Sequence, residues 1–409
     1  MVRLGLFLYD HLARREVLPG SAGVDLGSSL LGAPLKPQYA RGFVYSDGWV
    51  DDARLVVLSA LDARERGAEV LTQCPVIAAH RDARGWTVTL ANGRTVRSAA
   101  LINAAGPWAE SFLREVAAPA PVTKSLRLLK GSHIVVKRCV AHDHAYIFQN
   151  PDRRIVFATP YEGEFTLIGT TDVELAPTAL AGFAKAQIEA SEVDYLCAQA
   201  SRYFVKAVTP ADVVWSYAGV RPLLDDVDAE KSGDPSAVTC DYLLEPDPNG
   251  APLLSVWGGK ITTLRKLAED AADLIGGMLN DKRSAWTEKA HLPGGDLQDW
   301  IGAAEKPDVD FARFVQAVQQ RHVWLPPLLA HRLARAYGSR IGRVLGVAQS
   351  LADLGPAIAR GLHDAELRYL VAEEWACNAD DVLWRRSKLG LHFSASERDA
   401  VAALFQERA

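Results

Sequence analysis

The spacing of apolar residues along the chain separates helical from strand-like segments. Near the start, apolar residues three and four positions apart predict helices over residues 5–15 and 53–66. A stretch rich in Gly, Ser and Pro over residues 18–36 predicts a loop between them. Because Asp51 and Asp52 directly precede the second helix, one of them is expected to be its N-cap.

A period of two follows and predicts a long series of strands. They are expected at residues 69–71, 76–79, 86–90, 95–96, 99–103, 132–136, 145–149, 154–158 and 165–169. The Asn-Gly pair at residues 92–93 predicts a hairpin turn. The strand at 99–103 leads through Gly106 into a helix over residues 108–116, an arrangement that lets backbone approach a nucleotide closely.

In the second half of the chain, segments with helical spacing of apolar residues alternate with segments of period two, and the last part has helical spacing alone. Helices are expected over residues 185–204 and 261–278, and strands at 213–217, 240–244 and 253–257. A loop at residues 292–295 separates them from a tail over residues 310–408, where the apolar spacing is helical throughout. This change predicts the main domain boundary.

Length, charge and cysteine content narrow the class of protein. The 409 residues exceed what one hydrophobic core usually supports, so two structural units are expected. A net charge of −5 argues against a nucleic-acid partner. The sequence contains no run of 18 apolar residues, so no membrane span is predicted. The first residues also lack the pattern of a signal peptide. The five scattered cysteines predict neither disulfides nor a metal site, and suit a reducing cytosol.

The sequence Gly-Gly-Lys-Ile-Thr-Thr at residues 258–263 carries the most specific chemical signal. Two glycines end a buried strand, and a helix with hydroxyl residues near its start follows. The unpaired N–H groups and the dipole of a helix N-terminus favour an anion, such as a phosphate or a reduced flavin. An ordinary glycine turn with a threonine cap explains the same residues, so both interpretations stay open.

Other polar residues stand at the ends of predicted strands. His133 begins an apolar strand, where a histidine is usually structural, but imidazole also takes a hydroxyl proton near neutral pH. Gly-Thr-Thr-Asp at residues 169–172 presents three side-chain oxygens, which an ordinary capped turn would also contain. Arg221 suits either solvent or a phosphate, because its guanidinium is a planar fork of donors.

Taken in order, these motifs resemble those of the flavin-dependent glycerol-3-phosphate dehydrogenases of the bacterial aerobic and mitochondrial kind. The resemblance covers essentially the whole chain. It rests on YSDGWVDDARL at residues 45–55, NAAGPW at 103–108, KGSHIV at 130–135, IGTTD at 168–172, YAGVRP at 217–222, GGKITT at 258–263 and ADDVLWRR at 379–386.

The resemblance implies an α/β and α+β fold. An FAD-binding, Rossmann-like domain of the D-amino-acid-oxidase type would be joined to a substrate domain with an antiparallel sheet, followed by an all-α C-terminal domain. The oxidoreductase region would span residues 1–292 and the helical domain residues 296–409. Within the first region, the substrate sheet would comprise residues 1–50 and 126–222, and the FAD domain residues 51–125 and 223–280.

The resemblance also implies the activity. The family oxidises sn-glycerol 3-phosphate to dihydroxyacetone phosphate by hydride transfer to FAD and passes the electrons to membrane quinone. The protein would be cytoplasmic and peripheral on the inner face of the cytoplasmic membrane, and its helical domain would help to form a homodimer.

The family's functional residues map onto this sequence by motif. His133, Arg221 and Lys260 would be catalytic: His133 would take the C2 hydroxyl proton, Arg221 would bind the phosphate, and Lys260 would lie beside substrate and flavin. Thr170 and Asp172 would complete the substrate pocket. The expected FAD contacts are Ala105, Gly106, Gly258, Gly259, Ile261 and Thr262.

One departure from the family pattern concerns the cofactor. The family begins with a strand and a G-x-G-x-x-G turn that binds the ADP half of FAD. No such turn occurs in the 409 residues. The sequence is therefore expected to begin roughly a hundred residues inside the family pattern, through a missed start or a true truncation.

Other functions remain open from the sequence. A glycerol-3-phosphate oxidase, or another flavin-dependent amine or hydroxy-acid oxidase of the same superfamily, would share most of these motifs. An inactive remnant that acts only as an interaction module would explain the missing turn. The retained His133, Arg221 and Lys260 favour an enzyme for a phosphorylated alcohol.

We expect this polypeptide to bind FAD weakly or not at all, because the turn that holds pyrophosphate is missing from its sequence. The flavin absorbance of the purified chain after gel filtration checks this expectation. A yellow protein with one FAD per chain would contradict it.

Overall fold

The computed structural model describes residues 2–11, 18–117, 120–176, 185–225 and 242–406. The chain divides into two compact units. The first comprises Met1–Ser21, Tyr45–Thr72 and Lys289–Ala409, and the second comprises Ala22–Val44 and Gln73–Glu288.

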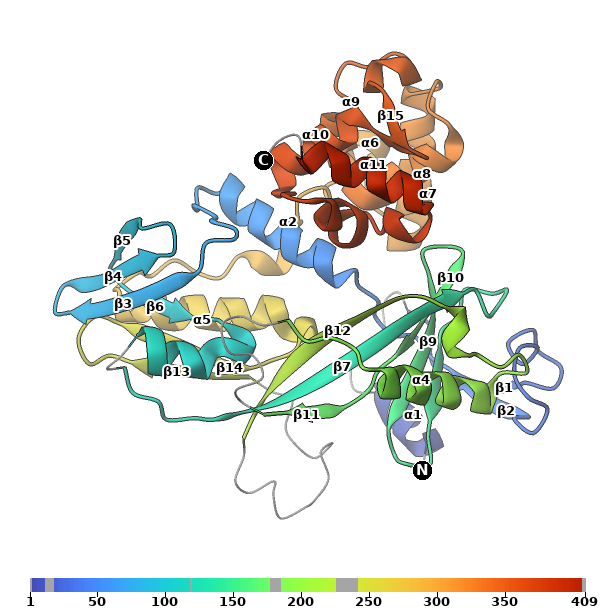
Figure 1. Cartoon of the computed structure of the whole chain (residues 1–409), viewed down its shortest axis with the longest axis horizontal. Helices are drawn as coiled ribbons and strands as arrows, with labels where there is room; N and C mark the ends of the chain where they lie inside the picture. Colours follow the sequence, from blue (N-terminus) through green and yellow to red (C-terminus); the bar gives the residue numbers. More distant parts are fainter. Residues whose placement is uncertain (1, 12–17, 118–119, 177–184, 226–241, 407–409) are drawn as a thin grey trace. The chain divides into compact units, whose positions relative to one another are not determined.

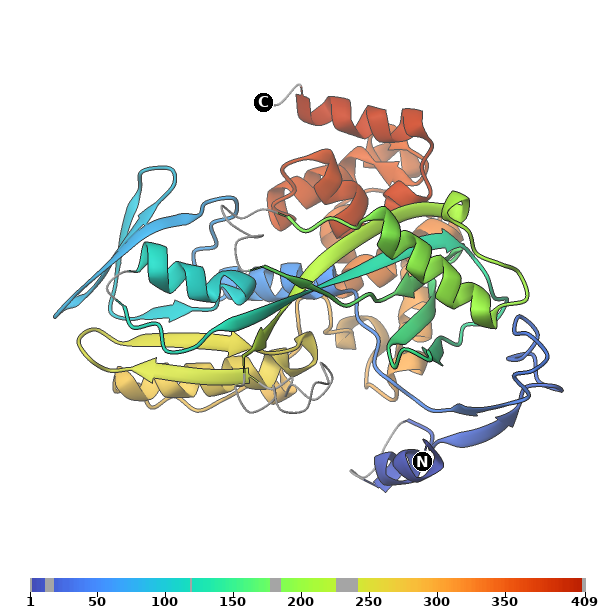
Figure 2. The same ribbon diagram turned by 60° about the horizontal axis from the view of Figure 1, so that its bottom comes forward.

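Two long antiparallel strands, β7 (Leu126–Lys137) and β12 (Val213–Leu224), run side by side in the second unit (Figures 1 and 2). They belong to a sheet of six described strands in which β12 pairs with β7 and the remaining order is β11-β7-β10-β9-β8. The other strands are β8 (Tyr146–Gln149), β9 (Ile155–Tyr161), β10 (Phe165–Gly169) and β11 (Val173–Leu175). Every pair in this sheet is antiparallel.

Helix α4 (Ala190–Tyr203) covers one face of this sheet. Its apolar residues recur at helical spacing, so Leu196 and Ala200 lie on one side of the helix. They are fully buried in one cluster with Ile134 of β7 and Ile168 of β10. The burial of these side chains fixes which face of β7 lies under the helix.

The second unit contains three smaller sheets. One has the order β13-β14-β6, with β13 (Tyr242–Asp247) antiparallel and β6 (Leu101–Asn103) parallel to β14 (Leu253–Gly258). Helix α5 (Leu264–Met278) follows β14 and contacts β13 and β14. The others are β3 (Val76–Asp82), β4 (Gly85–Leu90) and β5 (Thr95–Ser98) in one sheet, and β1 (Ala22–Asp25) with β2 (Arg41–Val44). A short helix α3 (Ala109–Ser111) begins near the end of β6.

The first unit is mainly helical. Its helices are α1 (Val2–His11), α2 (Asp52–Glu65), α6 (Gln298–Ile301), α7 (Pro307–Arg321), α8 (Pro327–Tyr337), α9 (Ile341–Leu345), α10 (Asp364–Glu374) and α11 (Ala395–Gln406). Phe314, Val318, Leu333 and Leu370 are buried in its core. A short hairpin, β15 (Ala357–Ala359) with β16 (Leu362–His363), interrupts the helices.

Ion pairs connect α2 to the C-terminal helices. Arg54 on α2 forms a bidentate pair with Glu374 at the end of α10, and the Glu374 side chain is fully buried. The carboxylate of Asp51 accepts a hydrogen bond from the backbone N–H of Arg54, which confirms the predicted N-cap. The same carboxylate lies 3.1 Å from the ammonium of Lys388. The motif at residues 45–55 is therefore joined by charge and hydrogen bonds to Glu374 and Lys388, which lie on either side of the motif at 379–386.

The strands β7 and β12 are longer than the strands expected at residues 132–136 and 213–217. Gly131, Gly219 and Pro222 interrupt the alternation of apolar residues there, but the backbone ladder continues through them. The strand expected at residues 69–71 is absent, and the helix expected from residue 185 begins at Ala190. The tail expected to be helical also contains β15 and β16.

Two expected elements are described only in part. Residues 12–15 of the first expected helix and residues 240–241 of an expected strand lie outside the described residues. The predicted Asn-Gly hairpin is present between β4 and β5, where Gly93 has a φ of +82°. None of the helices described here is long and apolar enough to cross a bilayer.

The compact units group some segments differently from the division expected from the resemblance. Residues 45–72 lie with the helical tail, although residues 51–125 were expected in the FAD domain. The pairing of Arg54 with Glu374 explains this grouping, because it joins α2 directly to the end of α10. The division by functional role stays a prediction.

We expect Glu374→Gln to lower the free energy of unfolding by about 3–5 kcal/mol, because it leaves the buried guanidinium of Arg54 without its counter-charge. Asp62→Asn is the matched control, since it breaks the more exposed pair with Arg66 and should cost about 1 kcal/mol or less. Urea unfolding followed by circular dichroism measures both. Equal effects of the two substitutions would contradict the role given to the buried pair.

Candidate active site

The alternation of side chains along β7 separates the face that α4 covers from the opposite face. Ile134 lies in the core that α4 covers, so residues of the same parity point toward the helix. His133 and Gly131 point to the opposite face. Across the ladder, His133 is paired with Tyr217 of β12, and Gly131 is paired with Gly219. The face opposite α4 is therefore where the predicted residues of these two strands gather.

The imidazole of His133 is held by its neighbours on both sides. Its ring stacks on the ring of Tyr217, with centroids 5.0 Å apart and planes inclined by 6°. On the other side, His133 is paired with Gly169 of β10. A Cβ atom on Gly169 would lie only 2.1 Å from Cδ2 of His133, so the absence of a side chain at residue 169 makes room for the ring.

The polar residues around Gly131 form a second group on the same side of β7. A Cβ atom at Gly131 would lie 2.7 Å from Oγ1 of Thr170 and 3.6 Å from Nη2 of Arg221, so both side chains approach this point. Arg221 donates a hydrogen bond to the carboxylate of Asp172. Both side chains of this pair are substantially exposed, so a soluble ligand can reach the guanidinium.

A buried network lies behind this group, on the α4 side. The carboxylate of Glu192 accepts hydrogen bonds from Oγ of Ser132 at 2.8 Å and from Oγ1 of Thr171 at 2.7 Å. It also lies 2.8 Å from the ammonium of Lys130. Burial raises the pKa of Glu192, but hydrogen bonds from Lys130, Thr171 and Ser132 outweigh it and hold the pKa below its ordinary value. Glu192 is therefore ionised at neutral pH.

The two predicted glycine turns follow neighbouring parallel strands. In β6 and β14, Asn103 is in register with Ser255, so the turns after both strands lie at the same edge of the sheet. Gly258 and Gly259 have φ angles of +70° and +95°, a conformation that favours glycine. Residues 261–263 then form a 3-10 turn that leads into α5.

The side chains of the turn after β14 reach solvent. Lys260, Ile261 and Thr262 are exposed, and Oγ1 of Thr263 donates to the carbonyl oxygen of Lys260 at 2.9 Å. Among the described residues, no hydrogen bond or ion pair joins Lys260 to His133 or Arg221. Lys260 belongs to the edge of the sheet formed by β13, β14 and β6, whereas the other two predicted catalytic residues belong to the β7–β12 pair.

The turn after β6 is held by a buried asparagine. Nδ2 of Asn103 donates to the carbonyl oxygen of Ala109 at 2.9 Å, and the turn between them contains Ala105 and Gly106. Gly106 has a φ of +55°, and the space where its Cβ atom would lie is open. The turn that follows, Gly106–Trp108, contacts both β12 and β14.

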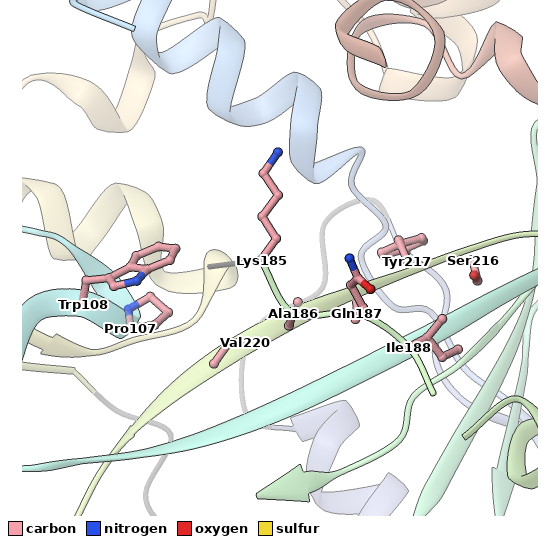
Figure 3. Close-up of a pocket in the computed structure, with 11 residues that line it drawn as sticks. Pro107, Trp108, Lys185, Ala186, Gln187, Ile188, Ser216, Tyr217 and Val220 are labelled. Atoms are coloured by element: carbon pink, nitrogen blue, oxygen red, sulfur yellow. The ribbon is translucent and has the colours of Figure 1, made fainter. Parts of the chain in front are cut away.

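A cavity of about 660 Å³ lies between this turn and β12. Figure 3 shows Pro107 and Trp108 at one end, and Lys185 and Gln187 projecting from the segment beside β12. The lining is completed by residues 186, 188 and 216–220. The cavity therefore connects the predicted cofactor turn with the strand that carries Tyr217 and Arg221.

Two residues of this site, Tyr217 and Trp108, were not predicted from the sequence. Tyr217 stacks on His133, and Trp108 lines the cavity. The signal for Tyr217 was present, because Tyr217, Gly219 and Arg221 alternate along one strand and must share a face. No equivalent signal identified Trp108, whose position depends on how the turn lies against β12.

Comparison with protein families identifies the chain. Residues 9–265 match the family described as FAD dependent oxidoreductase, and residues 285–408 match the C-terminal domain of alpha-glycerophosphate oxidase. The chain belongs to the FAD dependent oxidoreductase family. This confirms the resemblance seen in the motifs and the predicted fold class, with an FAD-binding region of the D-amino-acid-oxidase type and a helical C-terminal domain.

Several dehydrogenases are similar to this chain over nearly its whole length. The D-erythritol 1-phosphate dehydrogenase of Brucella abortus is 43% identical over 412 residues, which cover 99% of this chain and 78% of that protein. The aerobic glycerol-3-phosphate dehydrogenase of Escherichia coli is 42% identical, with 98% and 77% covered. The glycerol-3-phosphate dehydrogenase of Pseudomonas aeruginosa is 44% identical, with 97% and 75% covered.

A solved structure supports the fold. The dithionite-reduced L-alpha-glycerophosphate oxidase from Mycoplasma pneumoniae, with FAD bound, matches with a TM-score of 0.53 and 17% identity, covering 71% of this chain and 73% of that chain.

The residues of this family member fit one end of the family's flavin. Glycine turns with positive φ at the carboxyl ends of β6 and β14 leave backbone open to a ligand, and ligands of α/β sheets bind at that edge. The N-terminus of α5 adds a favourable potential for an anionic ring. No described strand leads into a G-x-G-x-x-G turn, so the described residues offer the ADP half no equivalent cradle.

We expect Gly169→Ala to displace the ring of His133, because the new methyl group would overlap it. The overpacking should lower the free energy of unfolding by about 1–3 kcal/mol and shift the imidazole resonances in NMR spectra. Gly219→Ala is the control on the same sheet, since no heavy atom lies within 4 Å of its Cβ position. Unchanged imidazole resonances in the Gly169→Ala variant would contradict the arrangement.

Proposed function

We propose that this chain oxidises the C2 hydroxyl group of sn-glycerol 3-phosphate to the ketone of dihydroxyacetone phosphate, with FAD as its cofactor. The observation that carries the proposal is that His133 and Arg221 lie on strands paired in register, on the face that α4 does not cover. The identity of 42–44% to glycerol-3-phosphate dehydrogenases supports the choice of substrate.

The substrate's phosphate binds at Arg221. The guanidinium is exposed and already holds an oxyanion, the carboxylate of Asp172. Its remaining donors make no hydrogen bond with the described residues, so they suit the oxygens of a phosphate. Thr170 adds a hydroxyl group beside Gly131, and the absence of a side chain at residue 131 makes room for Oγ1 of Thr170 next to the guanidinium of Arg221.

The proton of the C2 hydroxyl passes to a ring nitrogen of His133. Imidazole accepts a proton near neutral pH, and the stacking on Tyr217 keeps the ring in one orientation. FAD, when bound, would supply the two-electron oxidant that the loss of a hydride from C2 requires. Lys260 reaches solvent at the end of β14 and adds positive charge beside the substrate and the flavin.

The turns after β6 and β14 hold the flavin ring. Ala105 and Gly106 contribute one turn, and Gly258, Gly259, Ile261 and Thr262 contribute the other. Backbone geometry supports this assignment, because Gly106, Gly258 and Gly259 all have positive φ angles. No residue is assigned to the adenine end.

The electron acceptor, the location and the assembly are proposed from the motif resemblance alone. Electrons pass to membrane quinone, and the protein is peripheral on the inner face of the cytoplasmic membrane. A homodimer formed through the helical domain is part of the same proposal. Measuring acceptor preference with a quinone analogue against molecular oxygen separates a dehydrogenase from an oxidase.

D-erythritol 1-phosphate is a second candidate substrate. A relative of that name is 43% identical to this chain over 412 residues. Both compounds are polyols with a terminal phosphate, so Arg221 and His133 would serve them in the same way. The two substrates differ in the length of the polyol beyond the oxidised carbon, and their kcat/KM values decide between them.

The test is reduction of a quinone analogue by the chain with FAD added in large excess, because its own binding of FAD is expected to be weak. We expect turnover with glycerol 3-phosphate and none with glycerol or glycine, because only the phosphate engages Arg221. His133→Asn should lower kcat by about 10²–10⁴-fold. Arg221→Met should raise KM by roughly 10- to 100-fold, the loss of a charged hydrogen bond of about 1.5–3 kcal/mol.

Arg154→Met is the matched control for Arg221→Met. Arg154 also pairs with an aspartate, Asp152, and its side chain is partly exposed near the same sheet. This substitution should leave KM unchanged. Equal effects at Arg154 and Arg221, or equal turnover of glycerol and glycerol 3-phosphate, would contradict the proposal.

A further inference from the structure

The first turn of α4 carries a carboxylate that holds together three separate segments. Besides Ser132, Thr171 and Lys130, Glu192 accepts a hydrogen bond from the backbone N–H of Glu189 at 2.9 Å. Glu192, Lys130, Ser132 and Thr171 are all at most 5% exposed. A buried charge with this many partners is costly to disturb, so the three segments have one preferred arrangement.

The partners of Glu192 alternate with the proposed substrate residues. Along β7, Lys130 and Ser132 point toward Glu192, and the intervening Gly131 and the next residue, His133, belong to the face opposite α4. After β10, Thr171 points toward Glu192 and stands between Thr170 and Asp172. His133, Thr170 and Asp172 are therefore sequence neighbours of residues held by Glu192.

The segment between β10 and β11 depends on this network more than the strands do. Residues 170–172 join the two strands outside the regular ladder. The backbone N–H of Thr171 donates to the carbonyl oxygen of Ser132 at 3.3 Å, and Oγ1 of Thr171 accepts from the N–H of Ser132 at 3.0 Å. The hydroxyl group of Thr171 thus links the segment both to β7 and to Glu192.

We propose that Glu192 is a positioning residue, which acts through Thr171 and Ser132 to set Thr170, Asp172 and His133 for the substrate. The inference rests on the proposed function. Asp172 pairs with Arg221, so displacement of the 170–172 segment also moves the group that binds phosphate. A misplacement of about 1 Å is enough to cost about 10²-fold in rate.

Thr171→Val tests the link, because it removes the hydroxyl group and keeps the shape of the side chain. In the chain saturated with FAD, we expect kcat/KM for glycerol 3-phosphate to fall roughly 10- to 100-fold. Calorimetric affinity for glycerol 3-phosphate should fall as well, which gives a readout independent of turnover. Thr171→Ser keeps the hydroxyl group and should restore both values.

Thr166→Val is the matched control on the same sheet. Thr166 is fully buried on β10, and its Oγ1 accepts a backbone N–H from Cys139 at 2.9 Å, as Thr171 does from Ser132. Both valine variants leave a buried N–H unpaired, so both should lose thermal stability. Only Thr171→Val should lose kcat/KM and affinity at temperatures where both variants are folded.

A double-mutant cycle connects the effect to Glu192. If Thr171 acts through that carboxylate, the losses of Glu192→Gln and Thr171→Val are not additive in the double variant. Additive losses, or equal kcat/KM for Thr166→Val and Thr171→Val, would overturn the positioning role and leave the proposed function intact. No binding of glycerol 3-phosphate by the unchanged FAD-saturated chain would overturn both.

Discussion

The backbone ladder between β7 and β12 is the constraint on which the rest of the site depends. It aligns His133 with Tyr217 and Gly131 with Gly219, and it places Arg221 opposite Leu129. A slip of one residue would turn every one of these side chains to the opposite face. Burial of Ile134 and Ile168 under α4 fixes which faces of β7 and β10 lie against the helix.

The site combines two kinds of support that suit two kinds of ligand. The paired strands hold side chains with hydrogen-bonding and charged groups, which is what a small phosphorylated alcohol requires. The turns after β6 and β14 instead offer open backbone, which lets a planar ring approach closely. The cavity lined by Trp108 and Tyr217 lies where the two supports meet.

The sequence predicted the local chemistry better than the contacts between distant segments. Period-two spacing predicted the strand that carries His133, and glycines with the following hydroxyl residues predicted the turn after β14. Register between strands far apart in the sequence has no local signal, so the stacking of His133 on Tyr217 was not predicted. The pairing of Arg54 with Glu374, which lie 320 positions apart, was not predicted for the same reason.

The most direct measurement of the central claim is a crystal structure of the FAD-loaded chain with dihydroxyacetone phosphate bound. The account predicts the phosphate against Arg221 and Thr170, on the face of β7 opposite α4. It also predicts the C2 carbonyl oxygen within hydrogen-bonding distance of His133. A ligand held elsewhere, with Arg221 still engaged only by Asp172, would contradict the account.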